Sequence, residues 1–593
     1  MTTTFAARVP APAPYVRRGS RSRSWWLLAI GWVAQVALRL WLFRQHAGPV
    51  ANPDETGYLI AARWLAGGPG ADLTGFTFYQ GGYPLLLTPV FWFTQDPVVA
   101  YRLVVAVGSM VAAGAFPLAY LLLRRLGTGP RAAMAAAFAG GLSPSLLLFS
   151  GLALADAVLP TLVLAWLVAL HDLVARGSVR AGVLAGGLAG YAMAVHLRGT
   201  VVLAVTLLAM AGMLIAGRRG PAGRFFARRR GVAAGTATAG LSIARRRGAA
   251  AGLVAALVAA GAATALNRVL SAALYPGGAR DLSGLLAERV SGLDGQAWAL
   301  AGAAGQLWYL IAGTWGLAGV GLAGAVAVVA RRSAPGPRRV LAAVLLATTL
   351  GIAYASSAAL PDEHRIGNYA YGRYLACVAL AWTLAGLLVL ARAGRGAVVR
   401  HALAAAGLLA ATGGVVIWFA GDRLQRYAFI AFDFPEVIFL SRVRDSFDLV
   451  ATSLAALALL AGLVAAALLT ARRGWPAVLA VLAAVNLVFA ADLAPKSAPA
   501  AGPDWLPVLT GPGRVAVDRR VKWNIRAVLA YRVSWTEAEL YDGTPPAGVC
   551  TAVVPPHSGP APAGWAATGA GGTRQGWTTW VSDRCPGGSA RGR

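Results

Sequence analysis

Long apolar runs separated by short polar segments make up most of the chain. An apolar run of about 20 residues forms a helix that crosses a hydrocarbon core of roughly 30 Å. The pattern therefore predicts an all-α polytopic membrane protein with about 13 transmembrane helices. The expected spans are 25–43, 98–123, 131–148, 152–174, 181–197, 199–217, 249–273, a stretch that follows 315 and ends at 330, 340–358, a stretch between 374 and 392, 401–419, 448–470 and 475–491.

Two apolar stretches do not fit a simple span. Residues 82–93 are short and are interrupted by Pro84 and Pro89, so we expect a segment that lies on the membrane or re-enters it. If this segment crossed, the arginines after the next span would lie outside, against the preference of basic residues for cytoplasmic loops. Residues 298–330 are too long for one helix. We expect an interfacial piece that ends near Trp315 and then a span.

With these assignments, every arginine doublet or triplet of the membrane domain falls on one side, which we take to be cytoplasmic. The clusters lie at 124–125, 218–219, 228–230, 245–247, 331–332, 338–339 and 472–473. We predict a cytoplasmic N-terminal tail (1–24), a transmembrane domain (25–491) and a C-terminal domain outside the cytoplasm (492–593). No cleavable signal peptide is expected, because the first apolar run is long enough to cross and stay.

Composition agrees with a membrane protein. The chain is 58% hydrophobic, with a mean hydropathy of +0.61, more than soluble globular proteins carry. The net charge of +30 would suggest nucleic acid for a soluble chain, but here the arginines occupy loops, so we expect no nucleic-acid partner. The excess of Ala, Gly and Arg suggests a GC-rich genome, and we expect a bacterial plasma membrane.

The C-terminal tail has a different pattern. An Ala/Pro-rich linker precedes a strand-like stretch at 514–517, a helix-like stretch at 522–532 and an apolar strand at 549–554. We predict a small α/β domain. Cys550 and Cys585 are about 35 residues apart, and outside the cytoplasm they are expected to form a disulfide. The tryptophans of this tail either bind an acceptor sugar or belong to an exposed cap without a binding role. The sequence pattern does not distinguish these two roles.

The most informative polar stretch is residues 52–63, N-P-D-E-T-G-Y-L-I-A-A-R, just after the first apolar run. Asp54 and Glu55 lie where a membrane helix reaches water, and Tyr58 follows Asp54 by four positions. The pattern predicts an amphipathic helix along the membrane surface with its acids at the N-terminal end, where the helix dipole favours them. The plainer alternative is that the two acids simply begin a surface helix.

The motif Asp54-Glu55-Thr56-x-Tyr58, with Arg63 and Leu65 behind it, resembles the first periplasmic loop of the lipid A aminoarabinose transferases. It is also similar to that loop in the protein O-mannosyltransferases and other glycosyltransferases of the GT-C type. The resemblance implies a GT-C fold and sugar transfer from a polyprenyl-phosphate donor at this acidic pair. It covers about the first 220 residues well, the later loops weakly and the tail not at all.

Three acids are candidates for catalysis. Glycosyl transfer needs a carboxylate to take the proton of the acceptor hydroxyl. Asp54 is the expected base, and Glu55 would position the acceptor or tune Asp54. Asp156 lies near the top of an apolar span, where an acid is functional unless it snorkels or caps a helix, and it resembles the acid that follows the third span in these transferases. A divalent cation, Mg²⁺ or Mn²⁺, bridging Asp54 and Asp156 is an open alternative.

The leaving phosphate needs cations, and an arginine fork suits its oxygens. The candidates are Arg102, Arg198, Arg365 and Arg373, the last flanked by Tyr374. Arg198 lies in a stretch that resembles an Arg-Pro-Thr element of related enzymes, although Gly199 replaces the proline. Arg373 is the preferred ligand among the later loops; a snorkelling side chain is the alternative for each.

Three tyrosines near the acidic pair, Tyr58, Tyr79 and Tyr83, are candidates for binding the acceptor; Tyr79 and Tyr83 would otherwise be interfacial anchors. Together these residues predict an inverting glycosyltransferase that moves mannose or a pentose such as arabinose to a cell-envelope glycan, lipid or protein. The alternatives are a ligase that uses a polyprenyl-diphosphate glycan, a lipid or glycan transporter, and a non-catalytic envelope scaffold. A transporter would favour inverted repeats, which the chain does not show.

Overall fold

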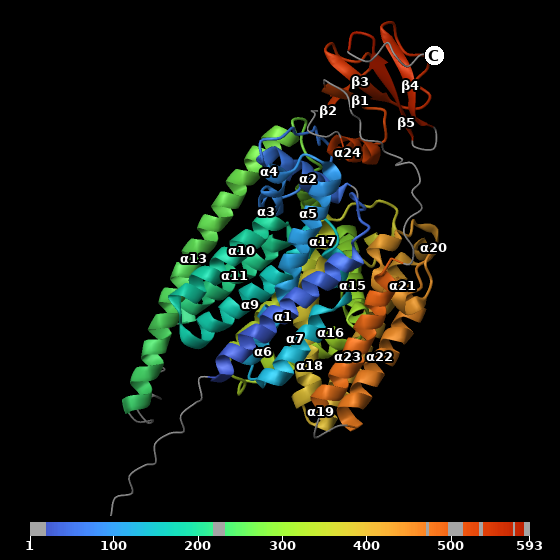
Figure 1. Cartoon of the computed structure of the whole chain (residues 1–593). Helices are drawn as coiled ribbons and strands as arrows, with labels where there is room; N and C mark the ends of the chain where they lie inside the picture. Colours follow the sequence, from blue (N-terminus) through green and yellow to red (C-terminus); the bar gives the residue numbers. More distant parts are fainter. Residues whose placement is uncertain are drawn as a thin grey trace, which may run out of the picture.

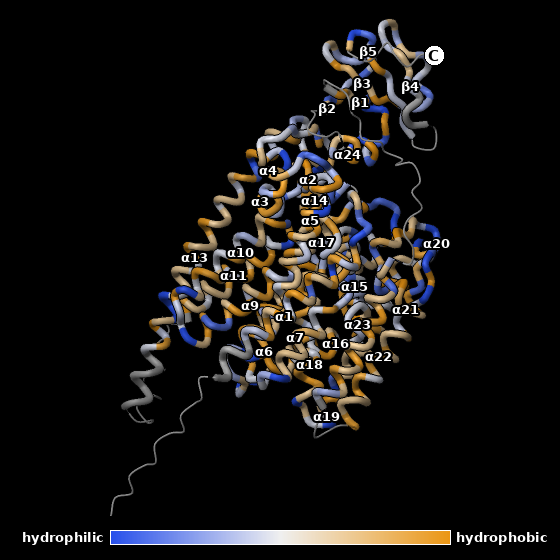
Figure 2. The backbone as a smooth tube through the Cα atoms, viewed as in Figure 1, coloured by the Kyte–Doolittle hydropathy of each residue, from blue (hydrophilic) through white to orange (hydrophobic). Residues whose placement is uncertain are grey.

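The apolar runs form helices that stand side by side in a bundle (Figure 1). The computed structural model describes residues 19–51, 53–216, 232–469, 474–495, 514–532, 538–572 and 576–585. Most of the expected N-terminal tail and linker, and the arginine clusters at 218–219, 228–230 and 472–473, lie outside these residues. Hydrophobic residues follow the bundle, and hydrophilic ones gather in loops at its ends (Figure 2).

Ten helices of the described chain are long and apolar enough to cross a membrane, or eleven if one bent pair counts as a span. The protein is therefore a multi-pass membrane protein. The long helices are α1 (Gly19–Leu42), α5 (Pro97–Ala113) with α6 (Ala115–Arg125), α9 (Leu159–Arg176), α11 (Arg198–Ala216), α13 (Val232–Leu274), α17 (Gly336–Ala359), α18 (Ala376–Arg392), α19 (Arg395–Ala420), α22 (Leu449–Leu469) and α23 (Gly474–Leu493).

The expected count of 13 is not confirmed. Two of the expected spans are short: α7 (Pro130–Gly141) ends after 12 residues, and α10 (Val179–Val195) has 17. The break after α7 comes at Ser143, whose backbone is extended before Pro144 begins α8 (Pro144–Phe149). A proline disfavours helical backbone in the residue before it. At 1.5 Å per residue, α10 would be about 25 Å long, less than a typical hydrocarbon core.

The apolar stretch 298–330 bends sharply. Helices α15 (Leu293–Gly313) and α16 (Leu317–Ala330) meet at 113°. Trp315 and Gly316 between them have left-handed backbones, with φ of 58° and 80°, a region that glycine enters freely and a bulky residue rarely does. The Trp315 indole is buried and donates to Asn486 Oδ1 at 2.8 Å, which holds the bend. A break near Trp315 is therefore confirmed.

Short helices cover one end of the bundle (Figure 1). Residues 82–93 form two of them, α3 and α4, rather than one span. These short elements are α2 (Asp54–Leu65), α3 (Gly82–Leu87), α4 (Val90–Phe93), η1 (Ala155–Ala157), α14 (Leu282–Ser291), η2 (Ile366–Asn368), η3 (Arg373–Leu375), α20 (Arg423–Arg426), η4 (Ala431–Asp433) and α21 (Pro435–Ser441).

The C-terminal region is a five-stranded mixed sheet with one helix, α24 (Trp523–Arg532), so the expected α/β character is confirmed. The strand order is β2-β1-β3-β5-β4; β1 pairs in parallel with β2 and β3, whereas β5 is antiparallel to β3 and β4. The strands are β1 (Arg514–Asp518), β2 (Ala538–Tyr541), β3 (Val549–Val554), β4 (Trp565–Gly572) and β5 (Trp577–Ser582).

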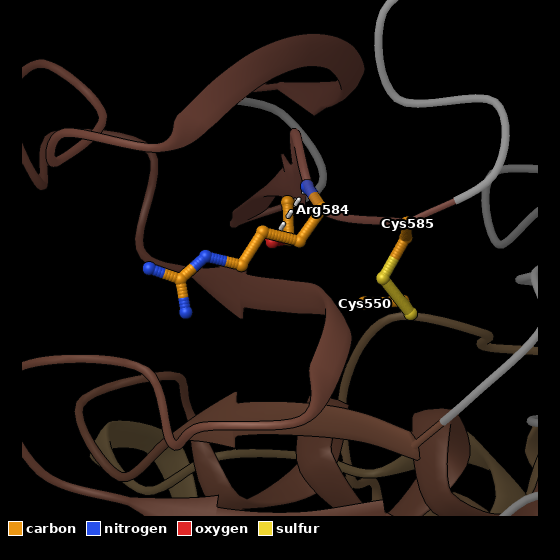
Figure 3. Close-up of a disulfide and its surroundings, with 4 residues drawn as sticks. Cys550, Arg584 and Cys585 are labelled. Atoms are coloured by element: carbon orange, nitrogen blue, oxygen red, sulfur yellow. Dashed lines mark hydrogen bonds between the residues drawn. A yellow bond between two sulfur atoms is a disulfide. The ribbon is translucent and has the colours of Figure 1, made fainter.

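Covalent and polar contacts fix this region. The expected disulfide between Cys550 of β3 and Cys585, just after β5, is present (Figure 3). Helix α24 lies between the sheet and the bundle (Figure 1). The buried Arg63 of α2 donates to the carbonyls of Ala530 and Tyr531 at the end of α24. The C-terminal region therefore contacts the helix that begins with Asp54.

Candidate functional site

Arg373 lies at the centre of a charged cluster. Its Nε donates to Asp156 Oδ2 at 2.8 Å, and its Nη1 contacts Asp54 Oδ2 at 2.5 Å. Arg198 Nη2 donates to the other oxygen of Asp156 at 2.7 Å. Two carboxylates and two guanidinium groups from four distant segments thus form one ion-pair network, and their formal charges cancel.

The chain folds so that helix ends bring these four residues together. Asp54 begins α2 and Arg198 begins α11, while Asp156 and Arg373 lie in the short helices η1 and η3, each directly before a long helix. Backbone N–H groups at a helix start favour a carboxylate, which suits Asp54. Polar groups are also tolerated better at helix ends than within a span. The network therefore forms where apolar helices terminate.

The two carboxylates of the network differ in exposure. The Asp156 side chain is fully buried, whereas 33% of the Asp54 side chain is exposed. Asp156 holds two arginines in place and has no access to solvent. Asp54 is the carboxylate of the network that an incoming hydroxyl group can reach, which supports the sequence-based choice of Asp54 as the base.

Glu55 lies apart from this network, although it adjoins Asp54 in sequence. It is fully buried and accepts four hydrogen bonds: its Oε1 from the backbone N–H groups of Val50 and Ala51, and its Oε2 from the Tyr101 hydroxyl and the Ala153 N–H. All four distances are 2.6 or 2.7 Å. Glu55 thus ties α2 to α5 and to the segment before η1, which is a positioning role.

The guanidinium of Arg198 also bonds to other groups of the protein. Besides Asp156, its Nη1 donates to the carbonyls of Arg373 and Tyr374, and its guanidinium lies 5.3 Å from the Tyr374 ring centroid. Its Nε donates to Nδ1 of His196; burial, followed by the Arg198 charge, lowers the pKa of His196 well below its usual value. Arg198 therefore orients the Arg373 segment and keeps His196 neutral.

The three predicted tyrosines pack together beside Asp54. The Tyr58 ring lies 5.1 Å from that of Tyr79 and 5.2 Å from that of Tyr83. The Tyr79 hydroxyl donates to Asp54 Oδ1 at 3.2 Å, and burial, together with the Asp54 charge, raises its pKa well above the usual value. A Cβ on Gly57 would lie 2.1 Å from the Tyr79 ring, so glycine lets this ring approach α2.

Two of the predicted arginines lie outside the network. Arg102 is exposed on α5 and makes none of the bonds described above. Arg365 pairs with Glu363 at 3.1 Å and with Asp433 at 3.7 Å, and its guanidinium lies 5.5 Å from the Tyr371 ring centroid. Arg198 and Arg373 therefore belong to the network, whereas Arg102 does not. Arg365 lies next to the network, because Tyr371 contacts both Arg365 and Arg373.

The sequence analysis missed two buried acids in the segment 420–447, Asp433 and Glu436. Burial raises the pKa of Asp433 to about 6 and that of Glu436 to about 7. The Tyr309 hydroxyl donates to Glu436 Oε2 at 2.7 Å. Two acids three positions apart within the apolar stretch F-D-F-P-E-V-I-F were the available signal, because acids in such surroundings are uncommon.

Beside Arg373, these acids line a small pocket, whose empty space is about 360 Å³ when the open solvent at its mouth is included. Its lining is largely apolar and comes from α8, the end of α15 and the bend after it, η3, α18, η4 and α21. The residues are Ser145, Phe149, Tyr309, Leu310, Gly313, Thr314, Gly372, Arg373, Ala376, Ala379, Asp433, Pro435 and Glu436. We refer to it as the Glu436 pocket.

A cation between Asp54 and Asp156 would compete with Arg373, which already bonds to one oxygen of each carboxylate. No group of three or more His, Cys, Asp and Glu side chains that could hold a metal is found within the described ranges. A divalent cation at Asp54 and Asp156 stays a prediction, and its binding would require Arg373 to move.

No protein-family model and no curated protein matches the chain. Several solved structures are similar to it. Over 95% of this chain and 98% of the other, the structure is similar to ArnT from Cupriavidus metallidurans bound to undecaprenyl phosphate, with a TM-score of 0.54 and 15% identity. The structure of ArnT in the apo state is similar over the same shares of the two chains, with a TM-score of 0.52 and 16% identity. The chain has the GT-C fold of ArnT.

The GT-C fold expected from the sequence is thus confirmed. Because residues 492–593 are about a sixth of the chain, coverage of 95% includes most of the C-terminal region. The sequence resemblance did not reach this far. The arabinosyltransferase EmbB from Mycobacterium smegmatis also matches, with a TM-score of 0.43 and 17% identity, over 82% of this chain and 42% of that one.

Proposed function

We propose that the protein is an inverting glycosyltransferase that moves a sugar from a polyprenyl-phosphate donor to a cell-envelope acceptor. The observation that carries the proposal is the position of Arg373 between the buried Asp156 and the accessible Asp54. This arrangement supplies a cation for the leaving phosphate and a carboxylate for the acceptor proton, the two groups that such a transfer needs. The binding of undecaprenyl phosphate by ArnT, which shares the fold, adds support.

In the proposed reaction the acceptor hydroxyl approaches Asp54 from its exposed side. Its oxygen attacks the anomeric carbon while its proton passes to an Asp54 oxygen. The bond from the anomeric carbon to the phosphate oxygen breaks, and its electron pair leaves on polyprenyl phosphate. Attack from the face opposite the leaving group inverts the anomeric configuration.

Arg373 is suited to the departing phosphate because part of its guanidinium is uncommitted. Its Nε and Nη1 are bonded to carboxylates, whereas no bond of its Nη2 is found within the described chain, and the residue lines the Glu436 pocket. Asp156 holds the Arg373 side chain through Nε, and Arg198 donates to the backbone carbonyl of the same residue. Preorganised donors of this kind stabilise developing charge without having to reorient during the reaction.

The sugar and the acceptor follow the sequence-based expectation, with mannose or a pentose such as arabinose as the transferred group. The test uses membranes containing the protein, an envelope extract as acceptor, and radiolabelled polyprenyl-phosphate arabinose or mannose. Label entering the extract, with release of polyprenyl phosphate and none in boiled membranes, is the expected result. If only a polyprenyl-diphosphate glycan is consumed, the ligase alternative replaces the proposal. If none of these three donors is consumed, the proposal that the protein is a glycosyltransferase is wrong.

A further inference from the structure

Three arginines meet at the loop that follows α6. Arg338 of α17 and Arg392 of α18 both donate to the carbonyl of Leu126, at 3.0 and 2.8 Å. Arg392 also donates to the hydroxyl of Thr128 at 2.7 Å, and Arg124 of α6 donates to the carbonyl of Thr128 at 2.6 Å. Three helices thus bring their guanidinium groups to one short loop, although they are distant from one another in the sequence.

These arginines lie at the end of the bundle opposite the candidate functional site, which is the end farther from the C-terminal sheet (Figure 1). Helix α18 begins directly after η3, which contains Arg373, and it ends at Arg392. Its 17 residues cover about 25 Å at 1.5 Å per residue, which is close to the thickness of a hydrocarbon core. Arg338 lies in the first turn of α17 and Arg124 in the last turn of α6, and both helices belong to membrane spans. The three guanidinium groups therefore lie where the headgroups of the second membrane surface are expected.

The three positive charges are not balanced by acids of the protein. In the part of the chain that the structure describes, their bonds go to carbonyl and hydroxyl oxygens, and none goes to a carboxylate. The connections from α6 to α7, from α16 to α17 and from α18 to α19 contain no Asp or Glu. Asp172, near the end of α9, bonds through both of its oxygens to Arg125, at 2.7 Å each. The carboxylate of Asp172 is therefore committed to another arginine.

Capping of α6 does not by itself account for this arrangement. Basic side chains often donate to the last carbonyls of a helix, but one guanidinium already caps the Leu126 carbonyl. Arg338 and Arg392 both lie within 3.0 Å of that oxygen, which is closer than the roughly 8–10 Å over which salt screens charges, so the two groups repel each other. Both side chains are exposed, so an anion can reach their remaining N–H groups. A phosphate would offset the repulsion and accept hydrogen bonds from both guanidinium groups.

We propose that Arg338 and Arg392, with Arg124 beside them, bind the phosphate of an anionic membrane lipid. A lipid is favoured over free phosphate because the site lies at the ends of three spans, where the bilayer holds its headgroups. A lipid with net negative charge, such as phosphatidylglycerol, suits the site better than phosphatidylcholine, whose ammonium group offsets its phosphate. The site is separated from Arg373 by the length of α18, so this inference does not depend on the proposed function.

The test measures how well three competitors displace fluorescent phosphatidylglycerol from the full-length protein in detergent: unlabelled phosphatidylglycerol, phosphatidylcholine and inorganic phosphate. For the wild type, phosphatidylglycerol should act at about a tenfold lower concentration than phosphatidylcholine, as expected for hydrogen bonds between charged groups. The double variant Arg338→Gln/Arg392→Gln should lose most of this preference. Inorganic phosphate should not displace the lipid at the concentration at which unlabelled phosphatidylglycerol does.

The matched control is the double variant Arg331→Gln/Arg332→Gln, which removes two exposed arginines from the connection before α17 and should keep the preference. Melting temperatures without added lipid show whether each variant is folded. If the double variant of the site is unfolded, Arg338→Gln and Arg392→Gln are measured singly, and each should lose about threefold of the preference.

The inference is overturned if the wild type does not prefer phosphatidylglycerol, or if the preference survives the substitutions at the site. It is also overturned if the control variant loses the preference equally, because that indicates a general attraction of lipid to a basic surface. Displacement by inorganic phosphate at the same concentration would assign the site to a free anion and overturn the lipid assignment.

Discussion

Nη1 of Arg373 lies 2.5 Å from Oδ2 of Asp54, although 319 positions separate the two residues along the chain. The contact joins the loop after α1 to the segment before α18. It places the cation expected to receive the phosphate beside the carboxylate expected to receive the acceptor proton. The same guanidinium bonds to Asp156, so the position of Arg373 depends on both acids, and replacing each acid should have a different consequence.

Asp156→Asn should destabilise the protein strongly. The substitution leaves Arg198 and Arg373 buried without a negative partner at that side, and breaking a buried ion pair typically costs about 3–5 kcal/mol. Thermal unfolding in detergent measures the loss. Asp54→Asn serves as the comparison, because Asp54 is partly exposed and, among the described residues, forms an ion pair with a single arginine, Arg373. An equal or larger loss for Asp54→Asn would contradict the assigned roles.

Glu55→Gln should act on stability rather than on chemistry. The carboxylate accepts from four donors, and an amide keeps one oxygen and turns an N–H₂ toward two of those donors. Because unsatisfied buried groups cost about 1–3 kcal/mol each, the melting temperature should fall clearly. Transfer per folded molecule should stay within about tenfold of the wild type. A stable Glu55→Gln variant that has lost all transfer would mean that Glu55 takes part in the reaction.

The contact of the C-terminal region with α2 should matter for stability. Burial lowers the pKa of Arg63 to about 10, so it is charged at neutral pH and can donate to the last carbonyls of α24. Arg63→Met leaves those carbonyls without this donor and should make the C-terminal region more sensitive to protease. Arg519→Met, at a half-exposed arginine of the same region, is the control. Equal sensitivity of both variants would show that the Arg63 contact is dispensable.

Glu436 should make stability depend on pH. Burial raises its pKa from 4.5 to about 7 in the folded state. Below pH 4.5 both states are protonated; between about 4.5 and 7 the unfolded state loses its proton first, so stability falls as pH rises. Asp433 acts in the same direction. Between pH 5 and 8 the melting temperature of Glu436→Gln should therefore fall less than that of the wild type. It should also fall less than that of the control variant Asp422→Asn, which changes an exposed carboxylate of the segment 420–447. Parallel profiles would show that Glu436 is not titrating there.

The sequence predicted those structural features that depend on a local pattern of residues. Apolar length predicted most spans, Pro84 and Pro89 predicted the break at 82–93, and the spacing and compartment of Cys550 and Cys585 predicted their disulfide. The count of 13 spans is not confirmed, because the length rule cannot see that Ser143 before Pro144 ends a helix early or that α10 stays short.

The sequence identified which residues form the candidate site, but not which of them bond to one another. Asp54, Asp156, Arg198 and Arg373 were each marked by being charged at the end of an apolar run. Which carboxylate meets which arginine depends on how distant helices pack, and no local pattern encodes that. Glu55 was expected to position the acceptor or tune Asp54, yet one step around a helix turns its side chain to α5. Asp433 and Glu436 were missed because their pocket forms only when α15, α18 and α21 meet.

The central claim is that Asp54 is the base of a sugar transfer from polyprenyl phosphate. The most direct measurement compares transfer by wild type, Asp54→Asn and Asp422→Asn at matched amounts of folded protein, using the radiolabelled donor that the wild type consumes. Loss of a general base typically reduces the rate by about 10²–10⁴-fold, so Asp54→Asn should fall by that factor while Asp422→Asn equals the wild type. Transfer by Asp54→Asn at the wild-type rate would contradict the claim and exclude Asp54 as the base.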